Sequence, residues 1–328
     1  MPRTIHILVC VSLVLIAPEA ARILAVVPTP SISHQVVFRP LTQELAKRGH
    51  DVTIITTDPV FPKGQTPENL TEIDLHDMSY KVWRNTILSS EFTSGNKDIF
   101  QQMEIFTSLI STIFEKQMEH PEVKKVTSNE TKYDLLILEL WVRPALLLSH
   151  VFKDVPVIAV SSFGCVAADY DIVGAPTRPT LLYPTLLRSR IVNLNLWEKV
   201  IELYINYVFE NIFASQGVSN DILIKKILGP DTPNIKELEK NIDMLFLNLH
   251  PIWEINRPST DEAITAGVPL IGMPMLADQF YNVEQSVLHE VGVRVDMDTL
   301  AEDTFLNAIN TVIDDKRCAV YTIVTNKE

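Results

Sequence analysis

The chain has 328 residues, of which 46% are hydrophobic and 21% are charged, a composition typical of a globular protein with room for two domains. Its formal net charge is -13 and its pI is near 5.1, and no block rich in Lys and Arg interrupts this acidic sequence. Because phosphate backbones repel such a protein, nucleic acid is excluded as a partner. The three cysteines form no disulfide framework and no Cys/His cluster with metal spacing, so no metal site is expected.

The first residues have the pattern of a cleaved secretion signal. Arg3 precedes an apolar run over residues 5–17, which is shorter than the roughly 20 residues of a membrane span and is followed by small residues. We expect residues 1–21 to be removed in the secretory pathway, placing the mature chain in the endoplasmic reticulum lumen or outside the cell. A buried first strand is the alternative. Two N-glycosylation sequons, usable in that compartment, begin at Asn69 and Asn129.

The mature chain then alternates between strand and helix patterns. A strand over residues 22–27, a helix over residues 36–48 and a β-branched strand over residues 51–56 make one βαβ unit of a parallel sheet. Residues 73–95 give mixed signals. Further strands are predicted over residues 133–138, 155–161 and 242–250, and further helices over residues 98–118, 143–153 and 194–214. This alternation predicts a doubly wound α/β domain.

The helix predicted over residues 194–214 contains four aromatic side chains. We expect Trp197, Tyr204, Tyr207 and Phe209 to belong to the core, and a shelf for a ligand is the alternative. The Gly- and Pro-containing stretch over residues 163–193 predicts a long loop or short helices over the sheet edge, and such loops commonly shape binding pockets.

His34 lies in a Ser-Ile-Ser-His segment after the first predicted strand, at the start of a helix. The carboxyl ends of parallel strands are where open α/β sheets bind ligands, so an imidazole there could act as a general base. A solvated histidine at a helix start is the alternative.

Glu139 follows the strand predicted over residues 133–138, and therefore lies at the same sheet edge as His34. A carboxylate there could hydrogen-bond the imidazole, fix its tautomer and stabilise its protonated form. A surface carboxylate at a strand end is the alternative. Asp134 is the second candidate, but it lies at the other end of the strand.

A second constellation runs from Ser259 to Gln279 and predicts a short helix, a Gly-Val-Pro turn, a buried strand and a loop. Ser259 and Thr260 can cap the helix, whose free amides suit a phosphate, while the carboxylate of Glu262 suits paired sugar hydroxyls. A strand over residues 293–296 and a helix over residues 301–314 are predicted to follow.

The order Ser-Thr-x-Glu-Ala, Gly-Val-Pro, Pro and Asp-Gln resembles the second half of the donor-binding signature of UDP-glycosyltransferases of the animal, insect type. The segment around His34, with its helix and Gly-His-Asp-Val-Thr, resembles their acceptor-side opening. The resemblance implies an α/β fold of two Rossmann-like GT-B domains, an acceptor-binding domain over residues 22–257 and a donor-binding domain over residues 258–328.

Residue by residue, the resemblance implies the following roles. His34 deprotonates the acceptor and Glu139 orients His34, where the family often has Asp. On the donor side, Ser259 and Thr260 hold the diphosphate, Glu262 holds the ribose, and Asp278 and Gln279 hold the sugar. The implied reaction transfers a hexose, glucose favoured, from a UDP-sugar to a hydroxyl of a small lipophilic acceptor with inversion. The UDP-sugar is a co-substrate, and neither a metal nor another cofactor is expected; homo- or hetero-oligomers with family members are a further option.

The sequence departs from the family just before Ser259, where Ile255-Asn256-Arg257-Pro258 stands in place of a His-Gly-Gly. We therefore expect a complete N-terminal domain and a truncated C-terminal one, without the strands that bear the uracil-stacking aromatic and phosphate-binding histidine. No apolar span of about 20 residues follows Asp314, so no membrane anchor is expected. Donor affinity should fall severely, which leaves two functions open: a glycosyltransferase, or a non-catalytic lumenal protein that binds lipophiles or relatives.

Overall fold

The computed structural model describes residues 20–89, 99–128, 130–162, 172, 194–248, 270–273, 283–284, 287–288, 292–296 and 300–314. The chain divides into two compact units. The first unit comprises Met1–Thr93, Ser108–Ser162 and Ser219–Leu245, and the second comprises Ser94–Thr107, Phe163–Val218 and Phe246–Glu328. The predicted domain boundary at Arg257 lies outside the described residues and stays a prediction.

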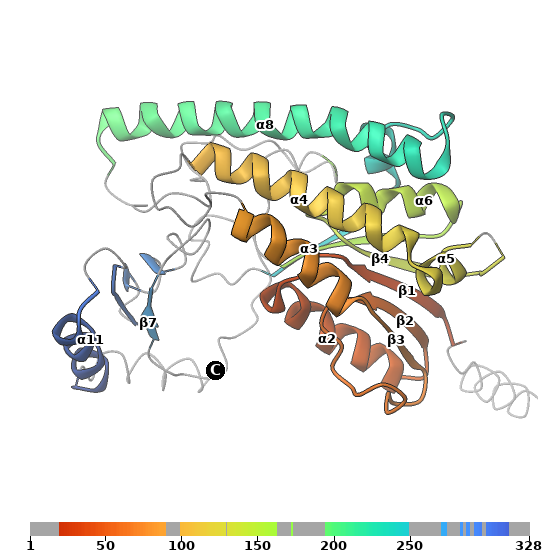
Figure 1. Ribbon diagram of the computed structural model, residues 1–328, viewed down its shortest axis with the longest axis horizontal. Helices are drawn as coiled ribbons and strands as arrows, with labels where there is room; N and C mark the ends of the chain where they lie inside the picture. The colour runs from red at the N-terminus through yellow and green to blue at the C-terminus, as the bar shows by residue number, and fades with distance from the viewer. Residues whose placement is uncertain are drawn as a thin grey trace, which may run out of the picture. The chain divides into compact units, whose positions relative to one another are not determined.

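The main sheet has six strands in the order β3-β2-β1-β4-β5-β6, and the neighbouring pairs from β3 to β5 are parallel (Figure 1). Its strands are β1 (Arg22–Val27), β2 (Asp51–Thr56), β3 (Leu70–Asp74), β4 (Leu135–Glu139), β5 (Val157–Ser161) and β6 (Met244–Leu247). Both faces of the central strands are buried, as the continuous apolar runs predict. The predicted doubly wound α/β fold is therefore confirmed.

Helices connect and cover these strands. They are α2 (Ile32–Lys47), α3 (His76–Ser89), α4 (Ile99–Glu119), α5 (Pro121–Val126), α6 (Leu147–Val151), α8 (Leu196–Leu228) and α9 (Ile235–Leu238), with short 3-10 helices η2 (Arg143–Leu146) and η3 (Glu239–Asn241). Phe38 of α2 is fully buried in a cluster with Val27 of β1 and Val52 of β2. This packing holds the start of α2 at the carboxyl edge of the sheet.

The helix α8 is longer than predicted and presents its aromatic residues differently. It continues to Leu228, and its C-terminal part lies beside α4, where Ser111 Oγ donates to Asn220 Oδ1 at 3.0 Å. Phe209 is buried, but Trp197 is 75% exposed, and Tyr204 and Tyr207 are also exposed. The core assignment is therefore wrong for three of these four aromatic residues, because Glu202 and Ile212 lie on the buried face with Phe209.

The second unit contains a parallel pair of short strands, β7 (Leu270–Gly272) and β8 (Gly292–Arg294), and the helix α11 (Glu302–Asp314). A Cβ atom on Gly272 would lie 2.4 Å from Cγ2 of Val283, so a side chain cannot be accommodated there without displacing Val283. These elements match the strands and the final helix predicted for this part of the sequence.

Candidate functional site

The order of the sheet strands marks one position at its carboxyl edge. The chain proceeds in one direction from β1 to β2 and β3, and then returns to the other side of β1 with β4. In open α/β sheets, ligands bind at the carboxyl ends of the strands where the strand order reverses. The residues after Val27 of β1 and at the end of β4 flank this point.

His34 and Glu139 meet at this strand-order reversal. His34 lies in the first turn of α2, and its Nδ1 is 2.5 Å from Oε1 of Glu139, the last residue of β4. The second carboxylate oxygen of Glu139 accepts a hydrogen bond from the backbone N–H of Thr29 at 3.1 Å. Glu139 is only 1% exposed, so each oxygen of this buried carboxylate has a partner in the protein.

These contacts select one tautomer of His34. A carboxylate only accepts hydrogen bonds, so the Nδ1 that faces Glu139 must carry a proton. The neutral ring then has its lone pair on Nε2, which is the form that accepts a proton from a substrate. The hydroxyl oxygen of Ser162, just after β5, lies 3.0 Å from the same Nδ1 and can share its proton as a second acceptor.

Two buried glutamines hold the loop between β1 and α2. Gln35 is 1% exposed, and its Nε2 donates to the carbonyls of Val27 and Thr29 at 3.0 and 2.9 Å. Gln117 of α4 donates from Nε2 to the carbonyl of Pro28 at 2.8 Å. The sequence does not point to Ser162, and for the two glutamines the available signal is a polar residue within an apolar helix face.

A separate cluster of polar side chains surrounds Asp58, which follows β2. The hydroxyl of Tyr80 donates to Oδ1 and Oδ2 of Asp58, both at 3.1 Å, and the guanidinium of Arg39 donates to the Asp58 carbonyl at 2.9 Å. Burial, and then the negative charge of Asp58, raise the pKa of Tyr80 to about 12. The phenol therefore remains a hydrogen-bond donor at neutral pH.

Asp134, the second candidate partner of His34, lies at the opposite edge. Its Oδ2 accepts from the backbone N–H of Arg22 at 2.8 Å, and this hydrogen bond lowers the pKa of Asp134. It therefore ties the start of β4 to β1 and does not contact His34.

The predicted donor residues Ser259, Thr260, Glu262, Asp278 and Gln279 all lie outside the described residues, so their placement stays a prediction. Among the residues that the structure describes, no three or more His, Cys, Asp and Glu side chains gather as metal ligands. Within the same residues, no helix is both long and apolar enough to cross a bilayer.

Similarities to known proteins fall on both parts of the chain. Residues 256–323 match the family model for UDP-glucoronosyl and UDP-glucosyl transferases. An ecdysteroid UDP-glucosyltransferase of Lymantria dispar multicapsid nuclear polyhedrosis virus is 33% identical over 247 residues, covering 74% of this chain and 48% of the relative. Another, from Spodoptera littoralis nuclear polyhedrosis virus, is 28% identical over 339 residues, covering 97% of this chain and 65% of the relative.

The chain thus spans 48% of the length of the Lymantria dispar virus relative and 65% of the length of the Spodoptera littoralis virus relative. A solved structure, the glycotransferase of kitacinnamycin, superposes with a TM-score of 0.55 at 13% identity, covering 93% of this chain and 94% of that one. This likeness concerns the fold alone, which is the predicted α/β fold of GT-B type. By the family match over residues 256–323 and the similarity to the viral relatives, the chain belongs to the family of UDP-glucuronosyl and UDP-glucosyl transferases.

Proposed function

We propose that the chain is by descent a glycosyltransferase that moves a hexose, with glucose favoured, from a UDP-sugar to a hydroxyl of a small lipophilic acceptor, inverting the anomeric configuration. We also propose that its replaced donor segment leaves the chain as printed with little activity. The observation that carries this proposal is the pairing of His34 with the buried Glu139 at the carboxyl edge of the sheet. The names of the viral relatives support glucose as the sugar and a hydroxylated steroid as a model acceptor.

In the proposed reaction, the acceptor hydroxyl approaches Nε2 of His34. As its oxygen attacks the anomeric carbon, the proton passes to Nε2, the new C–O bond forms, and the bond from that carbon to UDP breaks. Glu139 stabilises the imidazolium that results, because its carboxylate accepts the hydrogen bond from Nδ1. UDP leaves with the bonding electrons, and His34 later releases its proton to solvent.

The donor side of the proposal rests on sequence. Ser259 and Thr260 would hold the diphosphate at a helix start, Glu262 the ribose, and Asp278 and Gln279 the transferred sugar. Residues 255–258 replace the His-Gly-Gly of the family, so we expect this chain to bind UDP weakly and to transfer little sugar. The apolar run at residues 5–17 supports a place in the secretory pathway.

The test compares two proteins: the chain as printed, and a donor-restored chain in which the missing donor segment of a relative is inserted between Pro258 and Ser259. Each is incubated with UDP-glucose and an ecdysteroid, and both UDP release and the glucoside are measured. We expect transfer from the donor-restored chain, and its loss in His34→Ala. The matched control is His50→Ala, since the His50 Nδ1 accepts from the backbone of Ala21 at the other sheet edge. Equal rates in both variants would refute the role of His34.

A second function, binding of a lipophile or a family member without transfer, is favoured by the replaced donor segment alone. A thermal-shift titration with UDP separates the two functions. A ligand at about 100 times its dissociation constant should stabilise the fold by roughly 2.7 kcal/mol. Stabilisation of the chain as printed by millimolar UDP would favour transfer, whereas stabilisation by the steroid and none by UDP would favour binding alone.

A further inference from the structure

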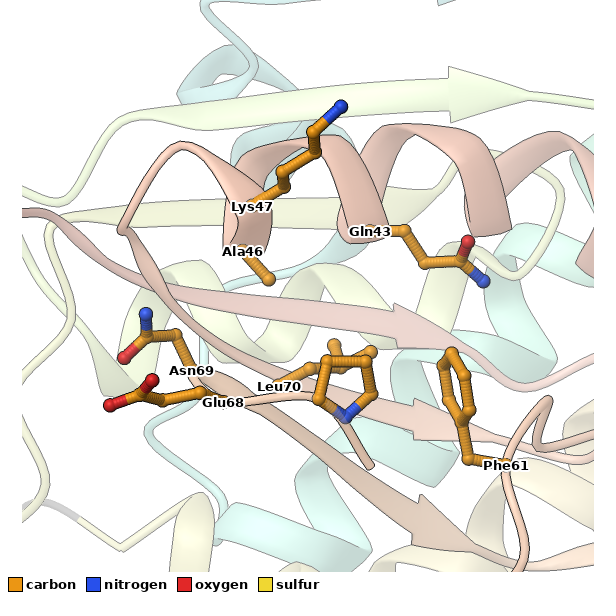
Figure 2. Close-up of a pocket in the computed structure, with 8 residues that line it drawn as sticks. Gln43, Ala46, Lys47, Phe61, Glu68, Asn69 and Leu70 are labelled. Carbon is orange, nitrogen blue, oxygen red and sulfur yellow. The ribbon is translucent and has the colours of Figure 1, made fainter. Parts of the chain in front are cut away.

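The described part of the first unit contains an open groove at the C-terminal end of α2, whereas His34 lies at its N-terminal end. The groove has a volume of about 440 Å³, which is within the size range of ligand sites, roughly 300 to 1,000 Å³. Figure 2 shows Phe61 at one end and Asn69 with Glu68 at the other, below Ala46 and Lys47 of α2. Its apolar wall is formed by Ala46, Phe61, Pro67 and Leu70, and polar side chains stand at its rim.

Asn69 has a fixed backbone at this rim. Its φ is 65°, a left-handed conformation that Asn tolerates better than most residues. Its carbonyl accepts a hydrogen bond from the N–H of Val52 at 2.8 Å, and the next side chain, Leu70, is buried. The direction of the Asn69 side chain is therefore set by the start of strand β3.

Asn69 is also the first residue of the sequon Asn69-Leu70-Thr71. In the folded chain Asn69 and Thr71 are exposed on either side of the buried Leu70. Within the residues that the structure describes, neither the Asn69 amide nor the Thr71 hydroxyl forms a hydrogen bond, although other polar groups nearby do. A sugar on the Asn69 side-chain amide would thus break no hydrogen bond among the described residues.

We propose that Asn69 carries an N-linked glycan whose first sugars lie along this groove. In the attachment step, Nδ2 of Asn69 bonds to the anomeric carbon of the reducing-end N-acetylglucosamine of a lipid-linked oligosaccharide. The bond from that carbon to the lipid diphosphate breaks, the diphosphate leaves, and Nδ2 gives up a proton to the base of the transferring enzyme. The apolar faces of Phe61 and Pro67 suit a sugar ring, while Gln43, Lys47 and Glu68 can bond its hydroxyls.

Such a glycan would protect an exposed sheet edge. The strand β3 is the last in the order of the main sheet, so among the described residues no further strand pairs with its outer side. Unpaired edges of this kind promote pairing between chains, and proteins commonly cover them. The proposal rests on the secretory location proposed above but does not depend on sugar transfer by this chain.

The test is expression of the full chain, with its own N-terminus, in insect cells, followed by treatment with an N-glycan-releasing amidase. Every variant carries Asn129→Gln, which removes the second sequon. We expect the amidase to change the gel mobility of this background and of Thr71→Ser, but not of Asn69→Gln or Thr71→Ala. Conversion of Asn69 to Asp on release, seen by peptide mass spectrometry, would identify the attachment site. An unmodified Asn69 in the background protein would overturn the proposal, whatever the transfer activity of the same preparation.

The contact with the groove is tested on the occupied protein. Enzymatic release of the glycan should lower Tm and speed amide exchange over residues 61–72, and both effects should vanish in Phe61→Ala. If release leaves Tm and exchange unchanged in the protein with Phe61, the glycan does not lie in the groove. Because sugar transfer is assayed separately, failure here is distinguishable from failure of the proposed catalytic function.

Discussion

The backbone N–H of Thr29 donates to Oε2 of Glu139 across 3.1 Å, although the two residues follow or end different strands. The other oxygen of this carboxylate contacts His34, so one buried side chain fixes both the loop after β1 and the imidazole. A change at Glu139 therefore alters the geometry and the tautomer of His34, the proposed base, together.

We predict that Glu139→Gln lowers kcat of the donor-restored chain about 10² to 10⁴-fold, the usual contribution of general base catalysis. An amide NH₂ facing Nδ1 would favour the tautomer with its proton on Nε2, which cannot accept one from the substrate. Glu139→Asp is one methylene shorter and cannot keep both contacts. Its kcat should therefore lie between that of the parent and that of Glu139→Gln. Steady-state kinetics with varied steroid measures the effect, and an unchanged kcat in Glu139→Gln would contradict it.

Ser162 should act as a positioning residue through His34. Removing its hydroxyl in Ser162→Ala deletes one acceptor beside Nδ1, an interaction worth about 0.5–1.5 kcal/mol, so kcat should fall about 2- to 10-fold with little change in KM. Ser162→Thr keeps the hydroxyl and should retain the rate. The control is Ser33→Ala, on the exposed surface of α2. A fall in KM without a fall in kcat would argue against positioning.

Gln35→Leu should destabilise the fold by about 2–4 kcal/mol, because the Val27 and Thr29 carbonyls and the Thr56 hydroxyl lose a buried partner. Urea denaturation of bacterially produced chain measures this difference. Gln43→Leu, on the same helix but without a described hydrogen bond, should stay within about 0.5 kcal/mol of the parent. Equal midpoints for the two variants would show that the loop does not need the glutamine.

Stability should fall at alkaline pH through two tyrosines. Burial is the main cause that raises the pKa of Tyr80 and of Tyr133 to about 12, from 10.0. Between these values the folded state keeps protons that the unfolded state loses, so their contribution is complete below about pH 10 and is lost as pH rises to about 12. Ultraviolet titration of phenolate in the parent, Tyr80→Phe and Tyr133→Phe should show one late-titrating group fewer in each variant. If both variants keep the same number of late-titrating groups as the parent, the raised pKa is wrongly attributed to Tyr80 and Tyr133.

The sequence predicted the central strands best. The strands β1 and β2 match their predicted bounds to the residue, because β-branched and apolar side chains fill both faces. The predicted start of α2 is four residues late, since Ile32 and Val36 are exposed and give no buried periodicity. Strand β3 and helix α3 were missed, because an edge strand with Glu72 and Asp74 lacks a continuous apolar run.

The candidate site was predictable in part. His34 and Glu139 could be paired because each ends or follows a strand of a parallel sheet, so topology alone brings them to one edge. Gln35 and Gln117 could not be found in this way, because their role depends on which carbonyls lie opposite them after folding. The same holds for Ser162, whose distance from His34 depends on how β5 and β4 pair.

The strand order also determines how long β1 waits for its second partner strand during translation. β1 lies between β2 and β4, but β4 begins at Leu135, so one side of β1 stays without a partner while more than a hundred further residues are made. At about 5–20 residues per second, this interval lasts roughly 5 to 20 seconds. During this interval, the nascent chain exposes the unpaired side of β1 to chaperones and to other chains. That side is paired only when β4 is made and Glu139 comes to lie beside His34.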